Sequence, residues 1–150
     1  SSHMTGVDIS PKMIEELERS GLYETAMVWD MSQGLPSVGA EVFDVVLAIG
    51  FMEFLKDPVS LLTGIASALK PEGQCLGSFE VYDAGGSAAR IVDNPSAGFP
   101  RYLYKRHELD KMFKAAGLRE TSYEMIAAYV SPVTGEARRY HVFSLCRERG

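Results

Sequence analysis

Two carboxylates stand where short apolar strands are expected to end. Asp8 closes the strand-like stretch at residues 5–10, TGVDIS, and Asp30 lies near the end of residues 25–31, TAMVWDM. In open α/β sheets, ligands bind outside the carboxyl ends of the strands. Asp8 is therefore predicted at a ligand-bearing edge, with a helix-start role beside Ser10 as its ordinary alternative. For Asp30 a surface strand-end role is equally open.

Four side chains are candidates for moving a proton, namely His107, His141, Tyr82 and Asp83. Residues 1–4, SSHM, are similar to an expression-vector remnant and are excluded from fold reasoning, which removes a third histidine. His107 is predicted at a helix start and His141 within a late strand, so both favour structural roles. The sequence identifies no catalytic residue.

Composition restricts the class of partner. Residues 5–150 fit one domain, with 46% hydrophobic and 23% charged residues over the chain, as in an ordinary soluble globular protein. Net charge is −5 and no block of Lys or Arg exceeds two residues, which argues against nucleic acid and for a small or neutral partner. No apolar run reaches the ~18 residues of a membrane span.

The positions of the two cysteines predict reduced thiols and argue against a zinc site. Cys75 and Cys146 lie inside apolar, strand-like runs and have no metal-ligand spacing. We therefore expect buried free thiols in a cytoplasmic protein and no zinc centre.

Strand and helix patterns alternate along the chain. Ser10-Pro11 and Asp57-Pro58 each predict a helix start, because a capping side chain precedes a proline at the first helical position. The first helix is predicted to end at Gly21 and to bury Met13, Ile14 and Leu17; the second is predicted to end at KPEG.

The strands complete the prediction. Residues 43–50, FDVVLAIG, are almost continuously apolar, which is typical of a strand covered on both faces. QCLGSFEVY predicts a further buried strand, residues 83–100 an excursion, residues 106–116 a helix, and two late strands a hairpin. This order predicts an α/β layered sheet, mostly parallel, with a C-terminal antiparallel hairpin.

Taken in order, five segments and the closing hairpin resemble class I S-adenosylmethionine-dependent methyltransferases, especially their small-molecule, type 11-like branch. The segments are GVDISPKM, WDMSQGLP, FDVVLAIGFMEFLKDP, LLTGIASALKPEGQCLGSFE and YKRHELDKMFKAAGL. The fourth, a helix followed by a Leu-Lys-Pro-x-Gly turn and a strand, is the most specific. The resemblance covers nearly the whole chain and implies a Rossmann-like methyltransferase sheet.

One part of the family pattern has no counterpart here. The family's first strand and its Gly-x-Gly loop, where a Cβ would obstruct the cofactor, should precede TGVDIS. The glycines of DAGGSAAR, residues 83–90, instead follow the fifth strand and predict a loop. We therefore expect an N-terminally incomplete domain whose first strand is missing. Residues 5–9 or another chain are then expected to fill the open edge of VVLAIG.

The resemblance also implies which residues form the site. It implies S-adenosylmethionine as cofactor, with the carboxylate of Asp8 on the ribose hydroxyls and that of Asp30 on the adenine amine. The other residues that the resemblance places there are Ile9, Met31, Ile49 and Gly50 for the cofactor, and Phe51, Tyr82 and Tyr102 for the substrate. A tight turn at Gly50 and a core position for Phe51 remain ordinary alternatives.

Three functions compete on this evidence. The first is methyl transfer to a small molecule by the intact form, with the chain as given inactive. The second is a non-catalytic methyltransferase-like protein that acts by binding a partner or by oligomerisation. Under either function, the open apolar edge predicts a homodimer or higher oligomer. A third, an NAD-dependent Rossmann enzyme, explains Asp8 but not the terminal hairpin.

Overall fold

A computed structural model describes residues 3–82, 91–92, 98–132 and 135–148 of the 150-residue chain. Its helices and strands alternate and then end in a hairpin. The elements are β1 (Thr5–Asp8), α1 (Pro11–Ser20), β2 (Thr25–Val28), η1 (Met31–Gln33), β3 (Phe43–Ala48), η2 (Met52–Phe54), α2 (Pro58–Ala68), β4 (Leu69–Glu80), β5 (Ile91–Val92), β6 (Arg101–Tyr102), α3 (Arg106–Ala115), β7 (Leu118–Val130) and β8 (Ala137–Arg147).

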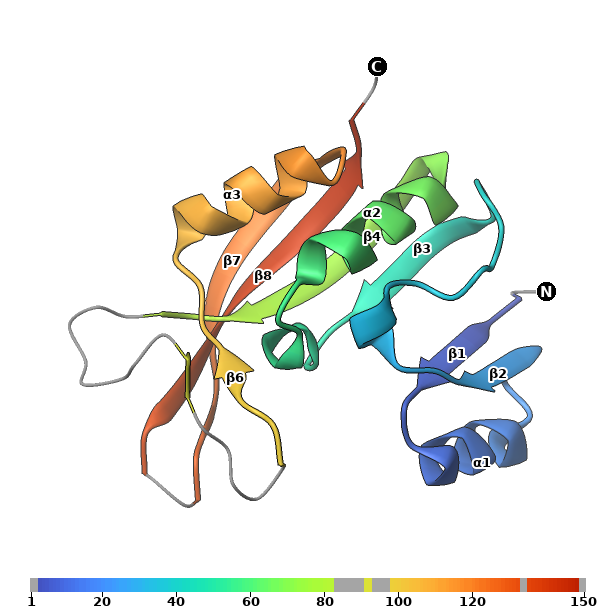
Figure 1. Ribbon diagram of the computed structural model, residues 1–150, viewed down its shortest axis with the longest axis horizontal. Helices are drawn as coiled ribbons and strands as arrows, with labels where there is room; N and C mark the ends of the chain where they lie inside the picture. The colour runs from blue at the N-terminus through green and yellow to red at the C-terminus, as the bar shows by residue number, and fades with distance from the viewer. Residues whose placement is uncertain (1–2, 83–90, 93–97, 133–134, 149–150) are drawn as a thin grey trace.

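The strands of the described residues form a four-stranded sheet and two pairs. β3 and β4 are parallel, while β8 and β7 add to β4 in antiparallel fashion, giving the order β3-β4-β8-β7. β1 pairs in parallel with β2, and β5 pairs with β6. In Figure 1, β1 and β2 stand beyond β3, on the side away from β4, and point the same way as β3. The predicted α/β class and the closing antiparallel hairpin are confirmed.

The predicted interruption lies between β1 and β3. Among the described residues, β1 pairs only with β2 and β3 pairs only with β4, so each presents one free edge. The expectation that residues 5–9 move against VVLAIG is therefore wrong for this structure. Filling of that edge by another chain stays a prediction.

Both predicted helix starts are confirmed by their caps. Ser10 Oγ accepts a hydrogen bond from the Met13 amide at 3.4 Å, and Asp57 Oδ1 accepts one from Val59 at 3.1 Å. Gly21 ends α1 with a φ of 67°, a left-handed conformation that glycine adopts without strain. Met13, however, is exposed, because α1 covers only the small β1–β2 sheet.

The core lies between the four-stranded sheet and the helices α2 and α3 (Figure 1). Aromatic rings at its centre meet mostly edge to face, with the rings of Phe113 and Phe143 centred 4.7 Å apart. Its fully buried members include Met52, Leu61, Leu62, Ile65, Leu69, Cys75, Phe79, Leu109, Phe143 and Leu145. Cys75 and Cys146 are both buried and unpaired, as the sequence predicts.

The prediction that β3 is covered on both faces is wrong. Side chains alternate along a strand, and Ala48 faces the core while Val45, Leu47 and Ile49 are more than half exposed. On the neighbouring strand β4, Leu76 pairs with Leu47 and is also exposed. α2 and α3 cover one face of this sheet, and no described element covers the other at these residues.

Two boundaries differ from the sequence prediction. β2 ends at Val28, and Met31 opens η1, because Asp30 caps that short turn. α2 ends at Ala68, so the KPEG sequence lies inside β4. There Gly73 passes close to β3: a Cβ on it would lie 2.8 Å from the Phe43 carbonyl oxygen, which only glycine avoids.

Candidate functional site

The carboxyl ends of four parallel strands point to one side of the molecule (Figure 1). Asp8 ends β1, and its carbonyl oxygen accepts a hydrogen bond from the Trp29 amide at 2.9 Å, so Asp30 follows directly across the β1–β2 sheet. Ile49 and Gly50 follow β3. The strand ends therefore bring the predicted cofactor residues to a common edge, in two groups separated by the free edges of β1 and β3.

The Asp8 carboxylate is oriented by its own turn. Its Oδ1 accepts a hydrogen bond from the Ser10 amide at 2.7 Å, which links the end of β1 to the start of α1. Ile9, between them, is 65% exposed and covers nothing in the described structure. The structural and ligand-binding interpretations of Asp8 are compatible, since the local hydrogen bond uses one of its two oxygens.

Asp30, a partly buried residue, presents a solvent-accessible carboxylate at the same edge. Hydrogen bonds from Ser32 hold the pKa of the Asp30 carboxyl below its ordinary value. The next residue, Met31, is partly buried against the core, where it anchors η1. A charged acceptor beside a partly buried thioether can bind the polar and the flat apolar parts of one ligand.

Gly50 forms the turn after β3. Its φ of 79° is left-handed, and its amide donates to Ser78 Oγ at 2.9 Å, which fixes the turn to β4. A Cβ at Gly50 would meet no other atom within 4 Å, so the backbone there borders open space. Ile49 is 57% exposed on one side of the turn, and Phe51 packs partly against the core on the other.

The predicted substrate residues Tyr82 and Tyr102 lie beyond the end of β4. The Tyr82 amide donates to the Tyr104 carbonyl oxygen at 2.8 Å, and the Lys105 ammonium lies 5.4 Å from the centre of the Tyr82 ring. Tyr102 belongs to β6 and packs partly against the core. Both thus lie at the carboxyl edge of the sheet, where β6 contacts η2, the turn that follows Gly50 and Phe51.

Sequence reasoning missed a buried ion pair at this end of the sheet. Glu80, the last residue of β4, is 2% exposed, and both of its carboxylate oxygens accept hydrogen bonds from Arg101, at 2.7 and 2.8 Å. Arg138 of β8 adds a third contact at 3.2 Å. This pairing ties β6 and β8 to the end of β4. The sequence does contain a signal for this pair, since Glu80 lies within the apolar run SFEVY. A buried acid is rarely left unpaired, so a basic partner was to be expected.

A second buried acid, Glu53, lies in η2 and is 3% exposed. Its Oε1 accepts a hydrogen bond from the Tyr140 hydroxyl at 3.2 Å, whereas its Oε2 has no partner among the described residues. Burial raises the pKa of Glu53, and the nearby Glu80 carboxylate adds to the shift. Glu53 thereby holds the segment after Gly50 and Phe51 against β8.

The candidate acid–base residues lie in different parts of the fold. His141 is buried: Nε2 donates to the Tyr104 carbonyl oxygen at 3.0 Å, so Nδ1 accepts from the Tyr123 hydroxyl at 2.9 Å. Burial also lowers the pKa of His141, in keeping with a structural role. His107 lies in the first turn of α3, as predicted. Asp83 falls outside the described residues.

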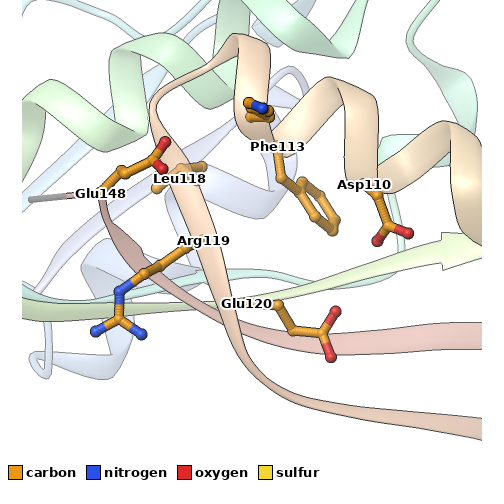
Figure 2. Close-up of a pocket in the computed structure, with 7 residues that line it drawn as sticks. Asp110, Phe113, Leu118, Arg119, Glu120 and Glu148 are labelled. Atoms are coloured by element: carbon orange, nitrogen blue, oxygen red, sulfur yellow. The ribbon is translucent and has the colours of Figure 1, made fainter.

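A cavity of about 290 Å³ lies elsewhere, between α3 and the start of β7 (Figure 2). Figure 2 shows Arg119 on the opposite side from the carboxylates of Asp110 and Glu120. Those two acids are both hydrogen-bonded to Arg106, which supplies one positive charge for the two carboxylates. The strand-end residues do not line this cavity, and we do not assign the site to it.

The described residues contain neither a candidate metal centre nor a candidate membrane-spanning helix. No group of three or more His, Cys, Asp or Glu side chains in the described parts is arranged to hold a metal ion. Along the same residues, no helix combines the length and the apolar character that crossing a membrane requires.

Comparison with known proteins gives this edge a family context. A family model described as a methyltransferase domain matches residues 1–75, half of the chain. The chain is also 29% identical over 125 residues to a ubiquinone biosynthesis O-methyltransferase of Actinobacillus pleuropneumoniae serotype 7 (strain AP76). That match covers 78% of this chain and 53% of the relative, so the chain spans about half the length of the curated relatives it matches.

Solved structures show the same fold at lower identity. A SAM-dependent methyltransferase from Methanosarcina mazei superposes with a TM-score of 0.77 at 15% identity, covering 97% of this chain and 82% of the other. Burkholderia thailandensis 1,6-didemethyltoxoflavin-N1-methyltransferase, solved with 1,6-didemethyltoxoflavin and S-adenosylhomocysteine, gives 0.72 at 20% identity. The coverage there is 97% of this chain and 61% of that one.

Proposed function

The chain belongs to the methyltransferase domain family, and on that premise we propose that it carries the ligand-binding edge of a small-molecule methyltransferase. The observation that supports this most directly is the shared position of Asp8, Asp30 and Gly50 at the carboxyl ends of parallel strands. The name of the curated relative, an O-methyltransferase, supports a hydroxyl group as the methyl acceptor.

The residues at this edge fit S-adenosylmethionine. The Asp30 carboxylate is solvent-accessible and the Asp8 carboxylate is oriented by the Ser10 amide. The backbone at Gly50 borders open space into which a ligand can approach. In the proposed complex, Asp8 accepts hydrogen bonds from the ribose hydroxyls and Asp30 from the adenine amine, with Met31 against the ring. In the same complex, Ile9 and Ile49 exclude water from the apolar surface of the cofactor. When bound, the cofactor supplies the methyl group.

The acceptor is proposed to lie next to Gly50. In the proposed site, Phe51, Tyr82 and Tyr102 supply apolar and aromatic contacts to the acceptor. Phe51 and Tyr102 pack partly against the core, and the buried contacts of Glu53 and Glu80 fix neighbouring segments. Orienting an acceptor oxygen in line with the methyl donor is the main task of such a site. None of the described residues is assigned the removal of the acceptor's proton.

Methyl transfer is proposed for a form in which a further strand fills the interval between β1 and β3. The free edges of these two strands and the exposed Val45, Leu47 and Ile49 support this, because native proteins rarely leave apolar strands open. In the 150-residue chain alone, two or three backbone hydrogen bonds to the cofactor would be lacking. Each contributes about 0.5–1.5 kcal/mol, which predicts binding weaker by roughly two to three powers of ten.

Calorimetry with S-adenosylhomocysteine tests the proposal. The 150-residue chain is expected to bind weakly or not at all, whereas a form extended by the filling strand binds and transfers a methyl group. In that form, Asp8→Ala is expected to weaken binding about tenfold or more, since charged hydrogen bonds contribute about 1.5–3 kcal/mol. Micromolar binding by the 150-residue chain itself, lost on Asp8→Ala, would contradict the need for a further strand.

A second candidate function has one specific observation in its favour. The exposed apolar side of β3 is also the surface that a non-catalytic, methyltransferase-like binding protein would use. An extended form that binds no cofactor would favour it. Two further proposals apply to either function: a cytoplasmic location, supported by the free thiols of Cys75 and Cys146, and self-association of the chain.

A further inference from the structure

We propose that the free edge of β7 is the surface through which two copies of this chain pair, antiparallel about a two-fold axis near Met125. β7 is the outer strand of the four-stranded sheet, so one row of its backbone groups has no strand partner among the described residues. All ten residues from 121 to 130 are exposed. Five of them are large and apolar or aromatic: Tyr123, Met125, Ile126, Tyr129 and Val130.

Between its two register shifts, this edge lacks the lysine and proline residues that keep many native edge strands apart. Proteins commonly place Lys or Pro on such strands. Residues 121–130, TSYEMIAAYV, contain neither, and Glu124 is their one charged residue. A long, exposed edge of β-branched and aromatic side chains of this kind favours pairing with a further strand.

The regular part of β7 has the length that self-pairing needs. Register shifts against β8 occur between Glu120 and Ser122 and again between Ala127 and Tyr129. Between them, residues 122–127 pair without interruption. A two-fold axis perpendicular to the sheet must place residues of the same face opposite one another. Pairing centred on Met125 satisfies this and uses residues 123–127 of both copies.

The charges also fit a second copy. In this register Met125 lies opposite its own copy, Tyr123 opposite Ala127, and Glu124 opposite Ile126. The Glu124 carboxylate therefore faces an apolar side chain of the other chain rather than a second carboxylate. Met125 shares a face with Tyr123 and with its cross-strand neighbour His141, and a flexible methionine adapts readily to such a contact.

The free edge of β3 is less suited to a symmetric partner. Figure 1 shows β1 and β2 beyond that edge, where a second copy of β3 would have to lie. A strand entering there would be flanked on both sides, which suits a single inserted segment. β7 has an open outer side, so the two edges are proposed to have different occupants.

Analytical ultracentrifugation of the 150-residue chain tests the surface. At micromolar concentration the chain is expected to sediment as a dimer. Met125→Lys places two ammonium groups face to face on the axis and is expected to raise the dimer dissociation constant at least about tenfold. Leu47→Lys is the matched control: Leu47 is 67% exposed on β3, and its substitution is expected to leave the dimer intact.

Cysteine cross-linking tests the register without relying on a charged substitution. Residues directly opposite in an antiparallel pair have Cα atoms about 4.5–5.5 Å apart, within reach of a disulfide. Met125→Cys is therefore expected to form a covalent dimer on oxidation. Ile126→Cys lies diagonally from its copy, at about 7–8 Å, and is expected to cross-link poorly. The natural Cys75 and Cys146 are buried in the chain.

Three results would overturn the proposal. They are a wild-type chain that sediments as a monomer, a dimer dissociated by Leu47→Lys but not by Met125→Lys, and a dimer in which Met125→Cys fails to cross-link. Thermal unfolding monitored by circular dichroism shows whether each variant is folded. Since none of these measurements involves cofactor, they stand apart from the outcome for methyl transfer.

Discussion

The hydroxyl of Tyr140 lies 3.2 Å from Oε1 of Glu53, although 87 residues separate the two in the sequence. The second carboxyl oxygen of Glu53 is buried and has no partner in the described parts of the chain. A neutral carboxyl tolerates such a position far better than an ionised one, because burial in a poorly polarisable environment disfavours charge. The contact therefore joins η2 to β8 at a cost that depends on pH.

Replacing Glu53 by Gln is expected to remove part of the pH dependence of stability. The folded pKa of Glu53 is raised above its ordinary value of 4.5, so its contribution is fully present below that pH and is lost as pH rises through the folded pKa. Gln cannot ionise. Near pH 8 the free energy of unfolding of the variant is therefore expected to exceed that of wild type by about 1 kcal/mol. Urea unfolding at acidic and alkaline pH measures this.

Glu15→Gln, at an exposed position of α1, is the control for that comparison and is expected to change little. A Glu53→Gln variant that loses stability equally at both pH values would show that the ionised carboxylate contributes favourably to the fold.

The buried ion pair of Glu80 and Arg101 is expected to be costly to break from one side. Of the contacts described for Glu80, Arg101→Met leaves its carboxylate only the longer one to Arg138, and should lower the free energy of unfolding by about 3 kcal/mol. Adding Glu80→Gln removes the charge and should recover more than half of the loss. Lys70→Met, which breaks the exposed pair with Asp44, should cost less than about 1 kcal/mol. Equal losses of unfolding free energy for Arg101→Met and Lys70→Met in chemical denaturation would contradict the stabilising role of the buried Glu80–Arg101 pair.

His141 is expected to destabilise the fold as the solution becomes acidic. Burial lowers its folded pKa below the ordinary 6.5, so its contribution is present above pH 6.5 and is lost as pH falls through the folded pKa. NMR titration of the ring protons should show a midpoint below the ordinary value in the native chain and a normal midpoint in urea. A native midpoint above 6.5 would require a negative partner that the described contacts do not contain.

The thiol of Cys75 is expected to be inert in the folded chain. Burial raises its pKa to about 12, and the thiolate is the reactive form. A thiol reagent at pH 8 should therefore modify neither cysteine of the native chain at an appreciable rate, since Cys146 is buried as well, and should modify both after unfolding. Fast modification of Cys75 in the native state would show that the core between β3, β4 and α2 opens readily.

Much of the local structure is determined by the sequence itself. Ser10-Pro11 and Asp57-Pro58 start helices because the capping oxygen and the proline ring act within one turn of chain. The late hairpin follows for a similar reason, since two apolar strands joined by a short turn have few alternatives to pairing. The order of these segments was sufficient to identify the family, and the strand ends place Asp8 and Asp30 at a common edge.

The tertiary structure decided what lies next to these elements. An apolar run such as VVLAIG predicts a strand but does not say how many of its faces are covered, and here Val45 and Leu47 remain exposed. Likewise, the sequence shows two acids in apolar surroundings but not their partners. Arg101 and Tyr140 reach Glu80 and Glu53 only after the chain has folded, because contacts between distant segments depend on the packing of the whole sheet.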